Sequence, residues 1–261
     1  MTNGTVRFGD GKKMSSRLGN VTRGLDVVEA VREKVRELVE DESLVNDVTI
    51  GAIKYAFARY RLGGDIAFDL DETVSLQGNS GPYLQYAHAR ARRILEKVEN
   101  PTSPTTVRTE DRALVRKLGE YREVIELSTQ ELAPHHICNY LFELAQEFNR
   151  YYEKNKVVGS DHELHRAGIV ALYADTLRAG LMILGIVAPE KMQLQEFRLY
   201  LRGGHRPVDT RYVFAERASE IHISTTETFV DIRRICLQLR VVDCDIWHRC
   251  FIDDEERGII S

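Results

Sequence analysis

The segment "AGIVALYADTLRAGLMILGI" at 167–186 constrains the fold most, because its apolar residues cover nearly every side of a helix. A helix of this kind is usually central in a bundle, since it needs other helices to bury it. We expect it to span about 161–186. The sequence therefore predicts a helical core in this part of the chain.

Amphipathic patterns upstream supply the helices that such a core needs. Apolar residues recur at helical spacing over about 82–98, around 114–125 and from about residue 134. Together with 161–186 they predict an antiparallel helical bundle from Gly81 to Met192. Its buried positions are expected at Leu84, Ala87, Ala91, Ile94, Leu95 and Val98, and at Ile137, Leu141, Leu144, Ala145, Phe148 and Tyr152.

Two further helical stripes precede the bundle, around 28–39 and 53–60, and the second is stopped by Gly63 and Gly64. Residues 65–81 are interpreted as a strand or an extended link, with a domain boundary near residue 78. Ser128 with Glu131 fits a capping box for the helix that begins near Pro134, since this spacing can satisfy two free amides.

The character of the chain changes again after Met192. Residues 193–261 contain ten arginines and no lysine, together with three of the four cysteines and the single tryptophan. Their apolar residues keep neither a helical nor a strand period, so we interpret them as an unassigned tail, α+β or irregular, that the bundle does not need for folding.

The composition limits which ligands and which cellular compartment we expect for the protein. A net charge of −4 argues against a generally basic nucleic-acid coat but leaves room for a local basic face. The cysteines form no CxxC pair, no apolar run approaches the roughly 20 residues of a membrane span, and no secretory signal is visible, which indicates a reduced, cytoplasmic protein without a membrane segment. We expect a monomer.

A glycine-rich basic loop, "GDGKKMSSRLGN" at 9–20, stands near the beginning of the sequence. Its "GKKMSSR" resembles the KMSKS signature loop of class I aminoacyl-tRNA synthetases. Three later segments resemble the arginyl-tRNA synthetase family in particular: "SLQGNSGPYLQYAHAR", "LAPHHICNYLFELAQEFNRYYEKN" and "GLMILGIVAPEKM". The resemblance covers about residues 4–192. Ser16 and Arg17 depart from the signature, and the family's HIGH motif has no counterpart.

The resemblance implies a mainly α fold in three parts. Residues 1–77 would be the remnant of a Rossmann-type catalytic domain, 78–192 the DALR anticodon-binding bundle, and 193–261 the unassigned tail. The implied function is arginine–tRNA ligation, with ATP and tRNA as substrates. The alternative is a stand-alone tRNA-binding module without catalytic activity, because the half of the catalytic domain that carries HIGH is missing.

The resemblance also assigns roles in the loop. Lys13 would stabilise the charge that grows on the leaving pyrophosphate, and Mg²⁺ would accompany the ATP. The ATP-binding residues would be Lys13, Met14, Ser15, Ser16 and Arg17. From the loop alone, an exposed basic turn is the favoured interpretation, and only the match of the later segments favours an ATP-binding loop.

A candidate tRNA face lies beside the buried stripe of the 82–98 helix. It is formed by Tyr83, Tyr86, Arg90, Arg93 and Lys97, whose rings and cations suit unpaired bases and phosphates. A second set at the start of the next long helix comprises His135, His136, Asn139 and Tyr140, close to free helix amides. Core packing or ordinary solvation remains the alternative for both sets.

Metal binding is a weaker hypothesis, and we expect no structural metal. His135, His136 and Cys138 lack a second ligand pair, and the spacing of Cys236, Cys244, His248 and Cys250 matches no standard zinc finger.

Overall fold

A computed structural model describes residues 4–8, 24–99, 101, 104 and 106–195, all within one compact unit. The predicted ATP loop at 11–17 and the tail from residue 196 lie outside the described residues. The described part is mainly helical, as the sequence predicts, and it packs around two hydrophobic clusters that share two helices.

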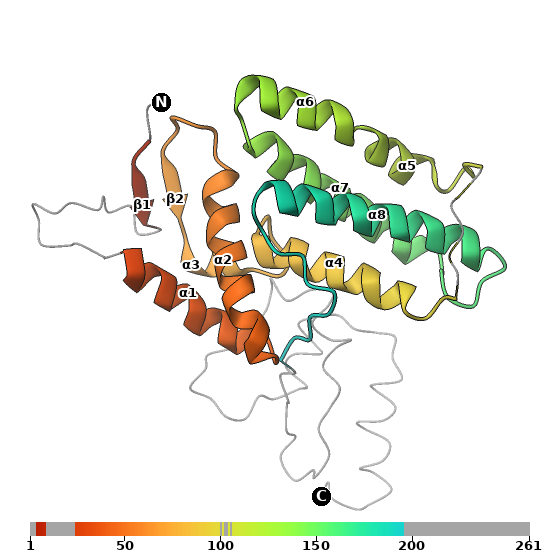
Figure 1. Ribbon diagram of the computed structural model, residues 1–261, viewed down its shortest axis with the longest axis horizontal. Coiled ribbons are helices and arrows are strands. Elements are labelled where there is room, and N and C mark those ends of the chain that lie inside the picture. The colour runs from red at the N-terminus through yellow and green to blue at the C-terminus, as the bar shows by residue number, and fades with distance from the viewer. Residues whose placement is uncertain (1–3, 9–23, 100, 102–103, 105, 196–261) are drawn as a thin grey trace, which may run out of the picture. The chain divides into compact units, whose positions relative to one another are not determined.

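The larger cluster is the core of the predicted antiparallel bundle (Figure 1). Its helices are α4 (Gly81–Leu95), α5 (Arg112–Gly119), α6 (Tyr121–Glu131), α7 (His135–Lys154) and α8 (Glu163–Ile183). Helices α4 and α7 run in one direction, and α6 and α8 return in the other. Inside, the rings of Phe148 and Tyr173 stack with their centroids 3.9 Å apart. The predicted stripes on α4 and α7 face this core.

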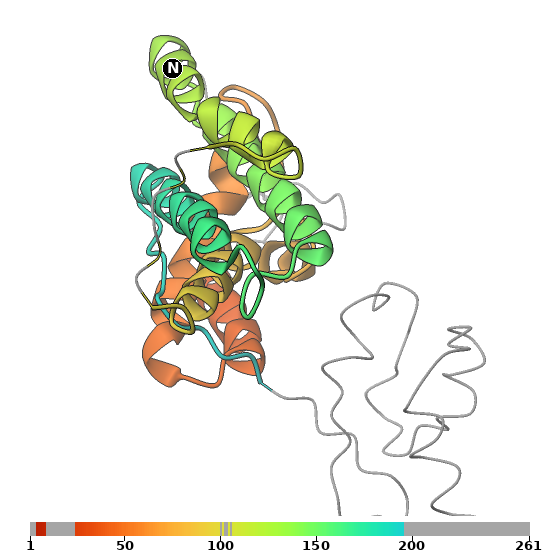
Figure 2. The same cartoon turned by 90° about the vertical axis from the view of Figure 1, so that its right-hand side faces the viewer.

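Helix α8 is less central than its composition suggests. One broad side, including Ile169, Leu177 and Leu181, is fully buried against α4, α5 and α7. On the other side Met182 is 64% exposed and Ile183 is 54% exposed. The helix lies at the margin of the bundle there, as Figure 2 shows.

The smaller cluster holds the N-terminal elements together. These are β1 (Val6–Phe8), α1 (Gly24–Leu38), α2 (Glu42–Ala58), β2 (Ile66–Phe68) and α3 (Leu70–Val74). The strands pair in parallel, with Val6 opposite Ile66. Val31, Val35 and Val48 form the buried seam between α1 and α2.

Helix α4 joins the two clusters through a close crossing with α2. A Cβ atom on Gly81 would stand 2.5 Å from the Gly51 carbonyl oxygen, so only glycine lets the two backbones approach this closely. Ser80 caps α4 by accepting a bond from the Tyr83 amide, and Pro82 occupies the first turn, as expected of a helix start.

After α8, residues 185–195 return across the molecule, and we call this segment the strap. Gln85 on α4 donates to the Val187 carbonyl at 2.8 Å, and the Met192 side chain is buried in the smaller cluster. Leu194 then bridges to Val39, and the Gln195 amide donates to the Leu38 carbonyl at 2.8 Å. Residues 193–195 thus pack on the α1–α2 turn, although the sequence placed them in the tail.

Three local expectations are wrong. Residues 65–81 contain the expected strand, β2, but they also contain helix α3, whose N-terminus is capped by the Asp69 side chain and which was not expected. The helix expected around 114–125 is divided at Glu120 into α5 and α6. Ser128 lies within α6, where its hydroxyl donates to the Ala133 carbonyl, so it does not cap α7.

Candidate nucleic-acid interface

A basic and aromatic surface forms where α4 lies along α7. We call it the α4–α7 strip; its residues are Tyr83, Arg90 and Arg93 from α4, Lys97 from the turn that follows α4, and Asn149, Arg150 and Tyr152 from α7. Tyr83, Arg90 and Arg93 share one side of α4 because Arg90 and Arg93 follow Tyr83 by seven and ten positions. Arg90, Arg93, Lys97 and Arg150 are all exposed, so the strip presents four cations to solvent.

Asn149 organises the part of the strip nearest the core. Its side-chain nitrogen donates to the Tyr83 hydroxyl at 3.0 Å, and its side-chain oxygen accepts from Arg90 at 3.5 Å. The Arg90 guanidinium also lies over the Tyr152 ring, 5.0 Å from its centroid. These contacts hold a cation and two aromatic side chains in a fixed arrangement between two helices.

Burial and nearby charge shape the chemistry of this surface. Partial burial raises the pKa of Tyr83 above its ordinary value, although the bond from Asn149 and the charge of Arg90 oppose the shift. The phenol therefore remains neutral and can donate or accept hydrogen bonds. Among the described residues, Arg93 and Lys97 have no ion-pair partner, whereas Arg150 lies 3.6 Å from Glu147. Both free cations are available to an anionic ligand.

Tyr86, the fifth residue predicted for this face, is half-buried and does not belong to the strip. Its side chain packs against the smaller cluster, while Tyr83 packs against the larger one and meets Phe142 edge-on at 5.6 Å. The predicted face therefore lies between the two clusters, with one tyrosine anchored on each side.

The second predicted set, at the start of α7, is divided by the fold. Asn139 is exposed and His135 half-buried, but Tyr140 is 2% exposed and its hydroxyl donates to the Lys117 carbonyl at 3.0 Å. His136 contacts Glu131 at 2.8 Å. The amides expected to be free are also occupied, because those of residues 136–138 donate to the carbonyls of Ala133 and Pro134.

Burial, more than the nearby charges, disfavours the protonated form of His135. Burial, the neighbouring His136 and Arg61 all lower its pKa. His135 and His136 stack with ring centroids 4.2 Å apart, and no group of three or more metal-binding side chains occurs within the described residues.

His165, on α8, pairs with the buried Asp111 at 2.7 Å, and this contact fixes the start of α5 to α8.

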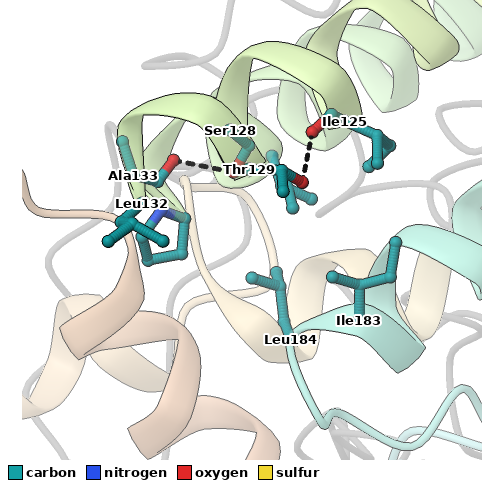
Figure 3. Close-up of a pocket in the computed structure, with 9 residues that line it drawn as sticks. Ile125, Ser128, Thr129, Leu132, Ala133, Ile183 and Leu184 are labelled. Carbon is teal, nitrogen blue, oxygen red and sulfur yellow. Dashed lines mark hydrogen bonds between the residues drawn. The ribbon is translucent and has the colours of Figure 1, made fainter.

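An apolar hollow opens at the end of the bundle, where α6 ends, α7 begins and α8 ends (Figure 3). Its volume is about 290 Å³. Leu132 stands at its rim with a left-handed backbone, φ 52°, and with 60% of its surface exposed. The hollow is lined by Ile125, Ser128, Thr129, Leu132, Ala133, Pro134, Ile137, Ile183 and Leu184.

Sequence reasoning identified the α4 half of the strip but missed the α7 half. Asn149, Arg150 and Tyr152 were available in "EFNRYYEKN", but only the packing of α7 on α4 shows which of them meet Arg90. Lys13, Met14, Ser15, Ser16 and Arg17 lie outside the described residues, so their predicted contacts with ATP stay predictions. None of the described helices is long and apolar enough to span a membrane.

Relatives that match this chain are arginine–tRNA ligases, and the family model that matches it describes an anticodon-binding domain. Residues 84–192 match the family model described as "DALR anticodon binding domain". The arginine–tRNA ligase of Frankia casuarinae is 37% identical over 205 residues, which cover 72% of this chain and 35% of that protein. The arginine–tRNA ligase of Limosilactobacillus fermentum is 33% identical and is likewise covered over 35% of its length.

Solved structures agree. The arginyl-tRNA synthetase of Thermus thermophilus superposes with a TM-score of 0.66 at 30% identity, covering 73% of this chain and 35% of that one. That of Plasmodium falciparum shares the fold, with a TM-score of 0.58 at 20% identity. The chain thus spans about a third of the length of its relatives. It is a homologue of the arginyl-tRNA synthetases over most of its sequence, and it carries their DALR anticodon-binding domain.

Proposed function

We propose that this chain supplies the tRNA-binding part of arginine–tRNA ligation, with the α4–α7 strip as the contact surface. The main support for this proposal is the strip itself. Asn149 holds Tyr83 and Arg90 in place by hydrogen bonds, and Arg93 and Lys97 are exposed. Aromatic rings stack on unpaired bases, and arginine or lysine side chains neutralise phosphates. The match to an anticodon-binding domain supports tRNA as the ligand.

The test measures binding of an arginine-acceptor tRNA by fluorescence anisotropy over a series of salt concentrations. Each lost phosphate contact should lower the log–log salt slope by roughly 0.7–0.9. The double variant Arg90→Gln with Arg93→Gln is therefore expected to bind more weakly and with a shallower slope. Arg122→Gln on α6, an exposed arginine paired with Glu126, is the matched control. If the control and the double variant changed tRNA affinity and salt slope equally, the strip would not be the tRNA-binding surface.

For catalysis, we propose that the loop at residues 11–17 contributes to ATP binding only within a complete synthetase. By resemblance, Lys13 would contact the phosphates, with Mg²⁺ bound to the ATP. The supporting observation is that about two thirds of the length of each relative has no counterpart here. The chain alone is expected to show no arginine-dependent exchange of pyrophosphate into ATP, even with tRNA present. Exchange clearly above an enzyme-free blank would contradict this.

The same observation favours a second candidate, a tRNA-binding module that works without any catalytic partner. The two candidates differ in one measurement. A ligase component should restore arginylation when it is combined with the missing part of a relative, whereas a stand-alone module should bind tRNA without restoring activity.

A further inference from the structure

Helix α8 is apolar on two sides, and one of these sides packs into the bundle. The packed side holds Leu177 and Leu181, which are fully buried. On the outer side Leu172, Met182 and Ile183 are all exposed. A helix at the margin of a bundle ordinarily turns polar side chains to water. The exposed apolar residues therefore point to a surface that another protein covers.

The outer residues of α8 follow the spacing of paired helices. Leu172, Asp175, Ala179 and Met182 are separated by three, four and three positions. We call these four residues the α8 seam. Positions at this spacing lie along one line of a helix and pack against the same line of a partner helix. The seam thus has the pattern of a helix that pairs with another helix, and the small Ala179 allows a close approach.

The α8 seam is complementary to itself when two copies of the helix run antiparallel. Leu172 lies five residues before position 177, and Met182 lies five residues after it. A two-fold axis at that level sets Leu172 of each copy opposite Met182 of the other. Asp175 and Ala179, two residues to either side of position 177, meet in the same way. A second copy of the chain therefore covers both apolar ends of the seam at once.

The charges beside the axis complement each other in this arrangement. Asp175 and Arg178 are exposed, and Asp175 has no ion-pair partner among the residues that the structure describes. Arg178 lies 3.8 Å from Glu190, which Arg92 contacts more closely. In the antiparallel pair, Asp175 of one copy lies within about 1.5 Å, the rise of one residue, of the level of Arg178 of the other. A parallel pair would instead set equal charges side by side.

We propose that α8 is the interface of a homodimer, in which two copies of the chain pair antiparallel along the α8 seam. Ile183 lies beside the seam and also lines the apolar hollow of Figure 3, so the contact extends toward the end of α6. An interface built mainly on one helix is small, and we expect a Kd in the micromolar range. The proposal replaces the monomer expected from the sequence, and it does not depend on the proposed tRNA binding.

Sedimentation equilibrium of the full chain measures the association, without RNA and over about 1–200 µM protein. The average mass should rise from one chain toward two and go no further. Met182→Glu places a charge in the seam at a position that is exposed in the free chain, and it should weaken the dimer at least about tenfold. Leu62→Glu is the matched control, because Leu62 is an exposed leucine that follows α2. It should dimerise like the unmodified chain.

Two charge variants test the antiparallel register. Asp175→Lys alone and Arg178→Glu alone each set like charges against each other in both ion pairs, so each should weaken the dimer at least about fivefold. In an equimolar mixture, the new lysine of one chain faces the new glutamate of the other, and the native Asp175 and Arg178 also face each other. The mixture should therefore form dimers with nearly the unmodified affinity.

Three results would overturn the proposal. One is a full chain that stays monomeric over the whole concentration range. Another is association that continues beyond two chains, or that Met182→Glu leaves unchanged. The third is a mixture of the two charge variants that associates no better than either variant alone, because the chains would then not meet in this register. Thermal unfolding of each variant checks that the free chain is folded.

Discussion

Asn149 on α7 donates a hydrogen bond to the hydroxyl of Tyr83 on α4 across 3.0 Å. The bond joins the two helices at the edge of the core, where Tyr83 packs against the larger cluster and Arg90 is exposed to solvent. Because Asn149 also accepts from Arg90, one side chain positions both an aromatic ring and a cation. Loss of its amide should therefore affect binding more than folding.

The substitution Asn149→Ala tests this relationship. We expect a loss of about 1 kcal/mol in the free energy of unfolding, since a neutral hydrogen bond contributes about that much. Affinity for tRNA should fall while the salt slope stays nearly unchanged, because no cation is removed. Urea unfolding and anisotropy titrations measure the two effects. Gln146→Ala, exposed on the same helix, should change neither.

The crossing of α2 and α4 gives a second prediction. In Gly81→Ala, the new Cβ would meet the Gly51 carbonyl at 2.5 Å, so the helices must separate. Overpacking of this kind costs about 1–3 kcal/mol. Gly119→Ala is the control, because nothing lies within 4 Å of its added Cβ. It should leave stability unchanged or raise it slightly. Equal melting temperatures for the two variants would show that the crossing tolerates a methyl group.

The left-handed backbone at Leu132 gives a third prediction. This conformation costs an ordinary residue about 1–2 kcal/mol, and glycine adopts it freely. Leu132 is 60% exposed, so its removal loses little burial (Figure 3). Leu132→Gly should therefore raise the melting temperature. Leu132→Ala loses the same apolar side chain but keeps the Cβ, and it should not. If alanine stabilises as much as glycine, backbone strain is not the cause.

His88 gives a prediction about pH. Its ring is 1% exposed, and Nδ1 donates to the Pro189 carbonyl of the strap at 2.9 Å. Burial lowers its pKa, although the Pro189 bond and Glu190 oppose the shift, and Arg92 and Arg178 add to it. The unfolded chain then binds a proton more readily than the folded one. Stability should be complete above about pH 6.5 and fall as the pH drops below it.

The measurement compares urea unfolding of the unmodified chain and His88→Gln at pH 7.5 and pH 5.5. Glutamine can keep a donor toward Pro189 but does not titrate. The difference in stability between the two pH values should be smaller in the variant. His135, whose pKa is also lowered, is retained in both proteins and contributes equally. An unchanged pH dependence would exclude His88 as its source.

How far the sequence predicts this fold depends on the range of the interactions. The buried stripe expected for the 82–98 helix, from Leu84 to Val98, follows from helical spacing alone and is confirmed, although α4 itself ends at Leu95. The division at Glu120 and the position of Ser128 were missed because both depend on how α6 packs and turns into α7. Local patterns favour one continuous helix there, and tertiary packing decides otherwise.

The candidate site also has a part that the sequence predicts and a part that depends on packing between helices. Tyr83, Arg90 and Arg93 lie on one helix, so their spacing predicts a shared face. Asn149 is 66 residues from Tyr83, and no local pattern pairs them. Tyr140 illustrates the converse, since its place near a helix start suggested a surface role while its ring is buried against Tyr121 and Lys117.

The strap has a consequence for how the protein is made. Gln195 bonds the Arg36 carbonyl across 159 residues of sequence, and Met192 is part of the cluster that β2, α1 and α2 begin. A ribosome that adds 5–20 residues per second needs roughly 8–30 s to cover that distance. During this interval the nascent α1–α2 turn is exposed without its closing segment. The smaller cluster is therefore begun well before the residues that complete it are synthesised.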